Sequence, residues 1–292
     1  MAAAQGAQAK MGMHPSSTTV NEPYEFKSET IQLIDSHYDP DGITGTRDYH
    51  SERVRQNITH IEGGIQMEPN SSELANLLPR ILGAAAVGTT YDLAETLPSS
   101  VISVDRVAKV FVYQGMVVDR ATFKASQGGP LSLDLSYKGV SETKNNAGTF
   151  PALVINTANG GPFILSDLAI TVGGVTYQFF DFELTLDNML ELRHLNSLTP
   201  TSITPRSRKI DVGLSSPWGD NSALYTANLP GSAVVATFTN GAMSLVFTMP
   251  AVAFPRQTPT VPGKTEIKHS LRGTARKSGS TPSLSITLDS TP

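Results

Sequence analysis

The chain has 292 residues, 39% of them hydrophobic, and can therefore bury one large core or two modest ones. Its 22 basic and 26 acidic residues give a net charge of -4, which argues against tight nucleic-acid binding, because phosphate contacts need a surplus of Lys and Arg. The lack of cysteine excludes disulfides and thiolate metal sites. No apolar run reaches the length of a signal peptide core or a membrane span, so we expect a soluble, unexported protein that does not bind membranes.

The chain is predicted to begin with a flexible arm and to continue as a single domain. Residues 1–24 are mostly small and polar and are assigned to the arm, and residues 25–292 are assigned to the domain. Within the domain, short segments alternate apolar and polar residues between Gly, Pro, Ser, Thr and Asn, which is typical of a mainly antiparallel β protein. The candidate strands are residues 26–34, 57–68, 107–115, 118–126, 131–139, 163–174, 209–214, 232–239, 242–248 and 283–289.

Two of the connections between these strands have strong turn signals. Asn240-Gly241 separates two alternating segments, and both residues tolerate the positive φ of a type I′ turn, which predicts a tight hairpin. The sequence QGGP at residues 127–130 predicts a second hairpin in the same way.

One helix is predicted over about residues 71–83. Polar capping residues at 70–72 precede it, and Gly83 follows as a stop signal. Its apolar residues have helical spacing, so the helix should lie on a sheet: Leu74, Leu77, Leu78, Ile81 and Leu82. Pro79 removes a backbone donor and should kink the second half.

The stretch from Val175 to Leu190 changes face partway along. Apolar residues first occupy one face of an extended strand and then, after Phe180, the opposite face; the two sets are Val175, Tyr177 and Phe179, then Phe182, Leu184 and Leu186. Such a slip is typical of a β-bulge, of a strong bend, or of a strand that serves two packing layers. A single irregular strand in a sandwich core is the simpler interpretation.

Residues 35–55 are polar and poor in core residues, which predicts a long loop between two strands, and loops of this length are usually functional or disordered. Five of them fall on calcium-loop positions, namely His37, Asp39, Asp41, Gly42 and Asp48. The pattern fails because His replaces the first acid and Asp replaces the bidentate Glu. A solvated turn at residues 39–42 is the better interpretation, and no metal site is predicted.

No enzyme or cofactor is predicted. The sequence has no GxSxG elbow and no HExxH motif, and its six histidines are scattered without ligand spacing. The GKT of residues 263–265 lacks the glycine of a phosphate loop, because Thr258 occupies that position.

A basic patch is predicted near the C-terminus, formed by Lys264, Lys268, Arg272, Arg276 and Lys277. Such a patch can meet phosphate or an acidic partner surface, and it can also be a solvated hairpin. Because residues 35–48 are rich in acid, self-association is an equally good interpretation.

In order and spacing, several stretches resemble the major tail tube proteins of long-tailed bacteriophages. They are GITGTRDYHSERVR, ITHIEGGIQMEPNSSELANLLPRILGAA, VFVYQGMVVDRATFKASQGGPLSLDLSYKGV and FILSDLAITVGGVTYQFFDFELTLDNML. The N-terminal residues and those after about Leu195 match less well. The resemblance implies a β-sandwich or barrel-like subunit with a packed helix, which forms hexameric rings whose inner sheets join and which stack into a tube.

The resemblance also implies partners. The tube would assemble in the host cytoplasm around a tape-measure protein, join a terminator and baseplate or tip proteins at its ends, carry a sheath if the tail is contractile, and pass DNA without gripping it. The early loop would reach the adjacent ring or subunit through Asp35, His37, Asp39, Asp41, Arg47, Asp48, Arg53 and Arg55. A strand that packs its own core and pairs with a neighbour would then have to switch face.

Two alternatives stay open from the sequence. One is a related tail component, such as a terminator, hub or decoration protein. The other is a β-sandwich that binds carbohydrate or protein, for which the single tryptophan, Trp218, offers a poor aromatic platform.

Overall fold

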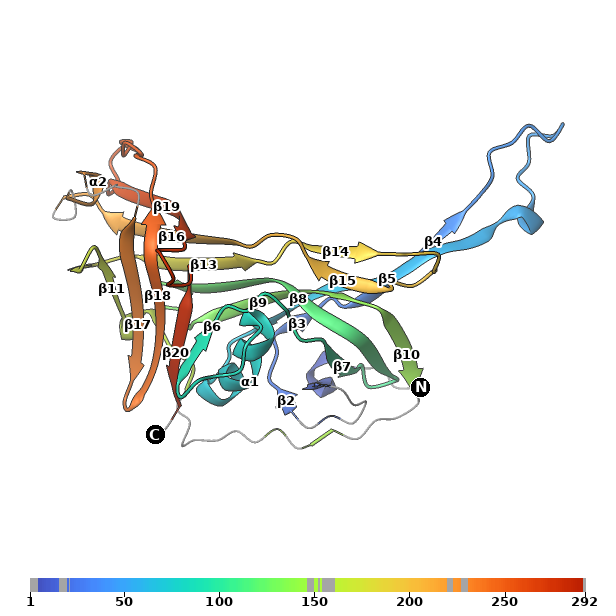
Figure 1. Cartoon of the computed structure of the whole chain (residues 1–292), viewed down its shortest axis with the longest axis horizontal. Coiled ribbons are helices and arrows are strands. Elements are labelled where there is room, and N and C mark those ends of the chain that lie inside the picture. Colours follow the sequence, from blue (N-terminus) through green and yellow to red (C-terminus); the bar gives the residue numbers. More distant parts are fainter. Residues whose placement is uncertain are drawn as a thin grey trace.

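The computed structural model describes residues 5–15, 20, 22–145, 150–151, 153, 161–219, 223–226 and 231–290 (Figure 1). Most of this part is β-strand, and each strand pair in it is antiparallel. The predicted mainly β fold with one packed helix is confirmed. Among the described residues, no helix has the length and apolar character needed to span a membrane.

The elements are as follows. The strands of the first half are β1 (Lys10–His14), β2 (Glu22–Tyr24), β3 (Ser28–Glu29), β4 (Gln32–Tyr38), β5 (Arg55–Met67), β6 (Thr90–Asp92), β7 (Ser100–Asp105), β8 (Val110–Ser126), β9 (Ser132–Gly139) and β10 (Ser141–Asn145). Those of the second half are β11 (Leu168–Val172), β12 (Val175–Tyr177), β13 (Asp181–Asp187), β14 (Leu190–Arg193), β15 (Ser202–Pro205), β16 (Lys209–Pro217), β17 (Ser232–Asn240), β18 (Met243–Ala253), β19 (Lys268–Arg276) and β20 (Ser285–Asp289). The helices are α1 (Ser71–Leu82) and the single turn α2 (Ala223–Thr226).

The strands form two main layers. Sheet I has the order β12-β11-β17-β18-β20-β6. Sheet II has the order β19-β16-β13-β8-β9-β5-β4. β18 links the two, because its first half pairs with β20 and its last residues pair with β19. The first half of β8 leaves sheet II and forms a small third sheet with β10, β7, β1 and β2.

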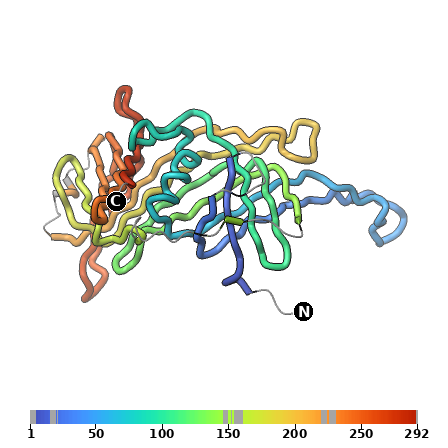
Figure 2. Tube along the Cα trace, turned by 90° about the horizontal axis from the view of Figure 1, so that it is seen from below, coloured from blue at the N-terminus to red at the C-terminus, as the bar shows by residue number. Residues whose placement is uncertain are grey.

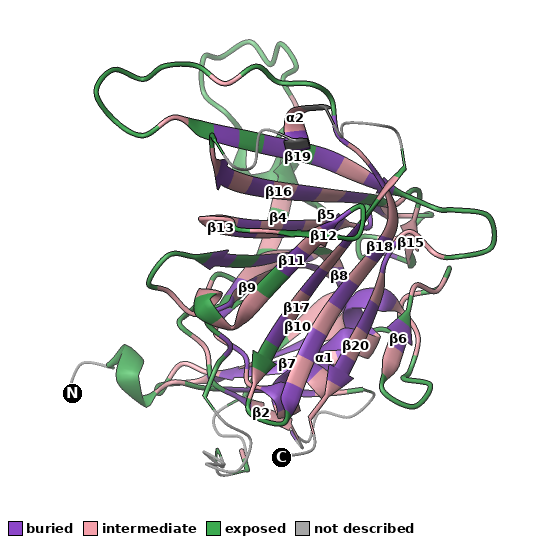
Figure 3. Ribbon diagram, turned by 90° about the vertical axis from the view of Figure 1, so that its left-hand side faces the viewer, coloured by how far each residue is buried: buried purple, intermediate pink, exposed green. Residues whose placement is uncertain are grey.

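Sheets I and II pack face to face through phenylalanines. Phe123 and Phe182 project from sheet II, and Phe238 and Phe247 project from sheet I. The ring centroids of Phe123 and Phe247 are 5.1 Å apart, and those of Phe182 and Phe247 are 5.6 Å apart. All four side chains are buried, and buried residues alternate with less buried ones along β16, β17 and β18 (Figure 3). The alternation read from the sequence therefore marks the inner faces of a sandwich.

The predicted helix is present as α1. The Asn70 side chain accepts a hydrogen bond from Glu73 N, and the Glu73 carboxylate accepts one from Asn70 N, which forms a capping box. Gly83 ends the helix with a φ of 96°. The predicted apolar stripe is fully buried beside β6, β8 and β20.

Pro79 lies inside α1 and does not end it. Because proline has no N–H, the Ala75 carbonyl loses its helical donor, and the Tyr91 hydroxyl of β6 lies 3.5 Å from that oxygen. The next residue after Pro79, Arg80, forms a buried ion pair with Glu22 at 2.7 Å and donates to the Tyr24 hydroxyl. These contacts connect α1 to strands on both sides.

The prediction of a flexible arm over residues 1–24 is wrong for the residues that the structure describes there. β1 pairs with β2 and β7, and Met11 and Met13 are 1% and 0% exposed. Gly12 lies between them because a Cβ there would be 2.1 Å from Cγ1 of Val20. The strand is short and contains glycine, so its two methionines gave too little alternation to be recognised. The rest of the predicted N-terminal segment, residues 1–4, 16–19 and 21, lies outside the described residues.

Both predicted hairpins are present, with one change in turn position. Gly128 has a φ of 78° between β8 and β9. Asn240 still pairs with Met243, so the second turn is formed by Gly241 and Ala242, and Gly241 has a φ of 63°.

The predicted loop at residues 35–55 is shorter in the structure. β4 and β5 extend into it as a two-stranded hairpin, which leaves residues 39–54 as the connection, with a 3-10 turn at Ser51–Arg53. Water reaches both faces of this hairpin, so its strands lack the apolar alternation by which strands are recognised.

The change of face after Phe180 is a change of sheet. β12 pairs with β11 in sheet I, residues 178–180 cross over, and β13 pairs with β8 and β16 in sheet II. The simpler interpretation, a single irregular strand, is therefore wrong. Of the alternatives, the structure agrees with a stretch that serves two packing layers, with two strands in place of one.

We predict that Met13→Ala lowers the free energy of unfolding by about 2–5 kcal/mol, because it removes a fully buried side chain. Lys10→Ala, on the same strand at an exposed position, should change it by less than about 0.5 kcal/mol. Urea unfolding followed by circular dichroism measures both. Equal stability of the two variants would show that β1 is not part of the core.

Candidate assembly surfaces

The hairpin of β4, residues 39–54 and the first half of β5 projects far beyond both sheets, and we call it the arm (Figures 1 and 2). Gly63 and Gly64 lie in sheet II, two and three residues from Ile61, where the pairing of β5 with β9 ends and the arm begins. A Cβ on Gly63 would be 2.4 Å from Thr30 O, and one on Gly64 would be 2.8 Å from Leu135 O. Gly63 also has a φ of 152°. Two glycines therefore allow neighbouring backbones to approach where the arm begins.

The β14–β15 hairpin runs alongside the arm and contacts its base (Figure 2). Thr59 N donates a hydrogen bond to Leu198 O at 2.7 Å, and Nε2 of His194 lies 3.4 Å from Thr59 O. This hairpin was not predicted, because β14 and β15 are four residues each and long-range contacts position them.

The start of β14 is fixed to sheet II by side chains of β8 and β9. The Asp119 carboxylate accepts a hydrogen bond from Leu190 N at 2.8 Å, and Lys138 Nζ donates to Leu190 O at 2.8 Å. The buried Asn188 amide donates to Val118 O at 3.1 Å. The β14–β15 hairpin beside the arm is therefore anchored to sheet II.

The predicted contact residues of the early loop all lie on the arm and are exposed. Asp39, Asp41, Arg47, Asp48 and Arg53 are in the connection, and the strands carry Asp35, His37 and Arg55. Residues 35–55 contain five acidic and three basic residues, which gives the arm a net charge of -2. In the part of the chain that the structure describes, no group of three His, Cys, Asp or Glu side chains could hold a metal ion.

The predicted basic patch lies on and around β19, and all five of its side chains are exposed. Lys268, Arg272 and Arg276 share the outer face of the strand, while Lys264 precedes it and Lys277 follows it. The segment from Arg256 to Lys277 holds six basic residues and one acidic residue, a net charge of +5. We call this segment the basic segment, and the long exposed loop before β19 belongs to it (Figure 3).

An aromatic cluster supports the basic segment from inside. The buried His269 ring lies 5.6 Å from Trp218 and 6.1 Å from Tyr225, measured between centroids. Burial lowers the pKa of His269 below 6.5, against the opposing effect of a backbone hydrogen bond with Gln257. Trp218 makes T-shaped contacts with both rings.

The arm and the basic segment occupy opposite ends of the longest axis of the molecule (Figure 1). The structure therefore does not bring the two predicted sets of contact residues together within one chain. Their opposite charges can meet only between two copies.

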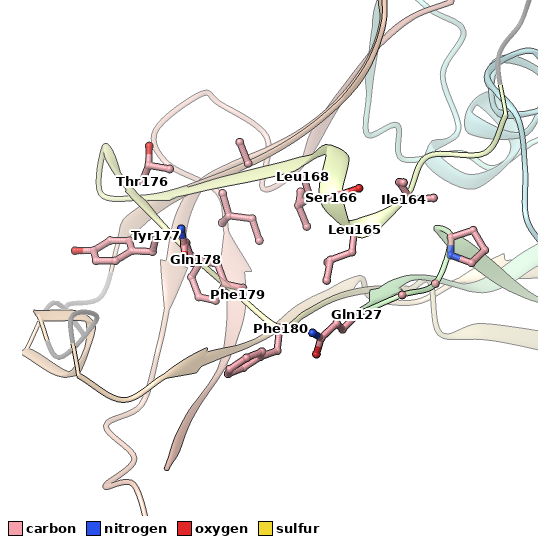
Figure 4. Close-up of a pocket in the computed structure, with 15 residues that line it drawn as sticks. Gln127, Ile164, Leu165, Ser166, Leu168, Thr176, Tyr177, Gln178, Phe179 and Phe180 are labelled. Carbon is pink, nitrogen blue, oxygen red and sulfur yellow. The ribbon is translucent and has the colours of Figure 1, made fainter. Parts of the chain in front are cut away.

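A pocket of about 740 Å³ opens where the chain crosses from sheet I to sheet II, and we call it the crossover pocket (Figure 4). Leu165, Leu168 and Phe179 pack against the core and form its apolar part, and Gln127 and Gln178 line its polar part. Phe180 stands at the side nearest the basic segment, with Lys268 Nζ 4.6 Å from its ring centroid. The change of face at Phe180 is visible in the sequence but the pocket is not, since the turn between β8 and β9 completes its wall.

The outer face of sheet II carries charges that are largely paired. Cross-strand ion pairs join Arg120 to Asp187 at 2.6 Å, and Lys124 to Asp134 at 3.5 Å. Burial raises the pKa of Asp181 on this face, while Lys268 and Arg272 act in the opposite direction. Away from β19, the basic side chains of this face are matched by carboxylates, so a surplus of positive charge is confined to the β19 edge.

The fold and these surfaces define a class of structural subunit: a β-sandwich with a projecting arm, complementary charged ends and, among the described residues, no metal cluster. A sequence model of the phage tail tube protein family matches residues 37–275, which include most of the arm, most of both sheets and most of the basic segment. The chain belongs to the phage tail tube protein family. A search of curated protein sequences gave no match.

Family membership makes the chain a structural component of a phage tail and thus of the virion. The family is not a class of enzymes, and it implies self-association and contacts with other tail components. It also removes the non-viral binding module from consideration.

We predict that Gly63→Ala destabilises the protein by about 1–3 kcal/mol, because the new methyl group meets backbone atoms at a positive φ. Gly213→Ala in β16 is the control: its Cβ would meet only Glu183 Cβ at 3.7 Å, so stability should be unchanged or slightly higher. Urea unfolding gives both values, and hydrogen exchange at residues 55–62 should rise only in the Gly63 variant. A neutral Gly63→Ala would contradict the close approach.

We also predict a pH effect from His269. Its pKa is lower in the folded than in the unfolded chain, so the stability contributed by the neutral ring is complete above pH 6.5 and is lost as the pH falls through the folded pKa. His269→Phe should therefore lose less unfolding free energy than the parent between pH 7 and pH 5, whereas the exposed His37→Gln should follow the parent. Identical pH slopes for all three proteins would contradict burial of a neutral His269.

Proposed function

We propose that this protein assembles into hexameric rings that stack into the tube of a phage tail, through which genomic DNA passes into the host. The observation that carries the proposal is the placement of an acidic arm and a basic segment at opposite ends of one molecule. The match to the tail tube family supports the same role.

Contact between the arm of one copy and the basic segment of the next is heterologous, since it joins two different surfaces. Each such contact leaves one arm and one basic segment free, so the contact repeats. Repetition along one axis gives stacked rings and a tube of indefinite length. The predicted contact residues of the arm, from Asp35 to Arg55, and the basic patch around β19 are the contact residues in this proposal.

Ring closure involves the edges of sheet II. Among the described residues, β4 pairs only with β5, and β19 pairs only with β16 between Lys268 and Gly273. Unpaired edges of this kind readily pair with another chain, and a closed ring removes them. The crossover at residues 178–180 fits a subunit whose strands serve its own core and an inter-subunit sheet.

The charge of the protein fits a conduit. A net charge of -4 and the paired charges on sheet II favour passage of DNA without tight binding. The protein therefore contacts DNA transiently and without sequence preference, uses no cofactor and catalyses no reaction.

The remaining partners follow from this role. Assembly takes place in the host cytoplasm around a tape-measure protein that occupies the lumen. A terminator and baseplate or tip proteins cap the two ends, and a sheath surrounds the tube if the tail is contractile. No membrane contact is involved.

We predict that the purified protein forms long hollow tubes in negative-stain electron microscopy, and that tubes are lost when residues 39–54 are replaced by a short Gly-Ser link. Asp39→Lys, Asp41→Lys and Asp48→Lys together should also abolish tubes, because they reverse the charge of the arm. Adding Lys268→Glu and Arg272→Glu should restore them, and high salt should weaken the parent tubes.

The parent protein itself provides the decisive control. If it stays a compact monomer at every concentration and salt in sizing chromatography, the stacking function is wrong and a related tail component, such as a terminator, hub or decoration protein, takes its place. If the charge-reversed arm still forms tubes, the arm does not make the stacking contact.

A further inference from the structure

The lining of the crossover pocket indicates what kind of side chain fits into it. It is apolar at its base, where Leu165, Leu168 and Phe179 point inward, and polar along one side (Figure 4). Ile164 at its rim is 43% exposed, which leaves more apolar surface in water. A volume of about 740 Å³ can receive several side chains.

The charge beside the pocket is positive. Lys268 Nζ lies over the ring of Phe180, and Arg272 shares the outer face of β19 with Lys268. An occupant that suits both the base and the rim of the pocket therefore has an apolar side chain flanked by carboxylates.

The arm carries such a group at its tip. Ile43 is fully exposed, and Tyr49 is 72% exposed. Asp41 and Asp48 flank them and are exposed as well. A large aliphatic side chain at the end of a projecting hairpin leaves water only when another molecule covers it.

We infer that the crossover pocket binds the arm tip of a second copy of this chain, with Ile43 inserted at its apolar base and the flanking aspartates facing Lys268 and Arg272. Charge complementarity selects this occupant, as does the position of the arm at the opposite end of the molecule from β11, which lines the pocket (Figure 1). The inference rests on the proposed stacking function and adds the receiving surface, which neither the basic patch nor the arm specifies alone.

Cysteine cross-linking tests the pairing without background, because the chain has no cysteine. We would assemble an equal mixture of Ile43→Cys and Gln178→Cys chains and treat it with a short bifunctional thiol reagent. We expect a covalent dimer from the mixture and none from either variant alone. A mixture of Ile43→Cys and Val87→Cys is the control, since Val87 is 85% exposed and lies outside the pocket.

A second measurement tests Ile43, the side chain that is proposed to enter the pocket. Ile43→Ala should raise the protein concentration needed for tube formation about tenfold, because it removes most of one buried aliphatic side chain per contact. Thr44→Ala, at the neighbouring exposed position, should leave that concentration unchanged.

The outcomes separate the two proposals. Normal tubes with no more cross-linking than in the Val87 control, or with no effect of Ile43→Ala, would overturn the pocket as receptor and leave stacking intact. Failure of the parent chain to form tubes would overturn the stacking function and this inference with it.

Discussion

The packing of Phe123 and Phe182 against Phe238 and Phe247 is the interaction on which the rest of the structure depends. It joins strands that are far apart in sequence and fixes the inner face of each sheet. Because aromatic side chains bury large areas, this contact also decides which residues face outward. The paired charges of sheet II, the face of β19 that carries the basic patch and the crossover at residues 178–180 all follow from it.

The two surfaces proposed for assembly, the arm and the basic segment, lie outside the core. The arm has water on both faces and buries little, so its position depends on two glycines at its base and on the β14–β15 hairpin beside it. The basic segment depends on the cluster of Trp218, Tyr225 and His269 beneath it. Two supports of different chemistry thus hold two surfaces of opposite charge at the far ends of one sandwich.

Local signals in the sequence were sufficient for α1 and for the two hairpins, because Asn70, Glu73, Gly83 and the turn glycines act within a few residues. The same reasoning failed for β1, whose burial depends on β2 and β7, and for the ends of the arm, where solvent on both faces removes alternation. The proposed contact residues were chosen from charge and from the family resemblance, and they stay a prediction. The crossover pocket was not predicted, because the turn between β8 and β9 closes it from another part of the chain.

The course of β5 has a mechanical consequence. This strand runs without a break from the arm into sheet II, where residues Ile61 to Met67 pair with β9 (Figure 1). A pull along the arm is therefore directed along the strand and loads these ladder hydrogen bonds together, in shear, where a pull across the strand would open them one after another. In the proposed tube, tension along the arm would therefore enter the next subunit through the backbone of β5, with little demand on any single side chain.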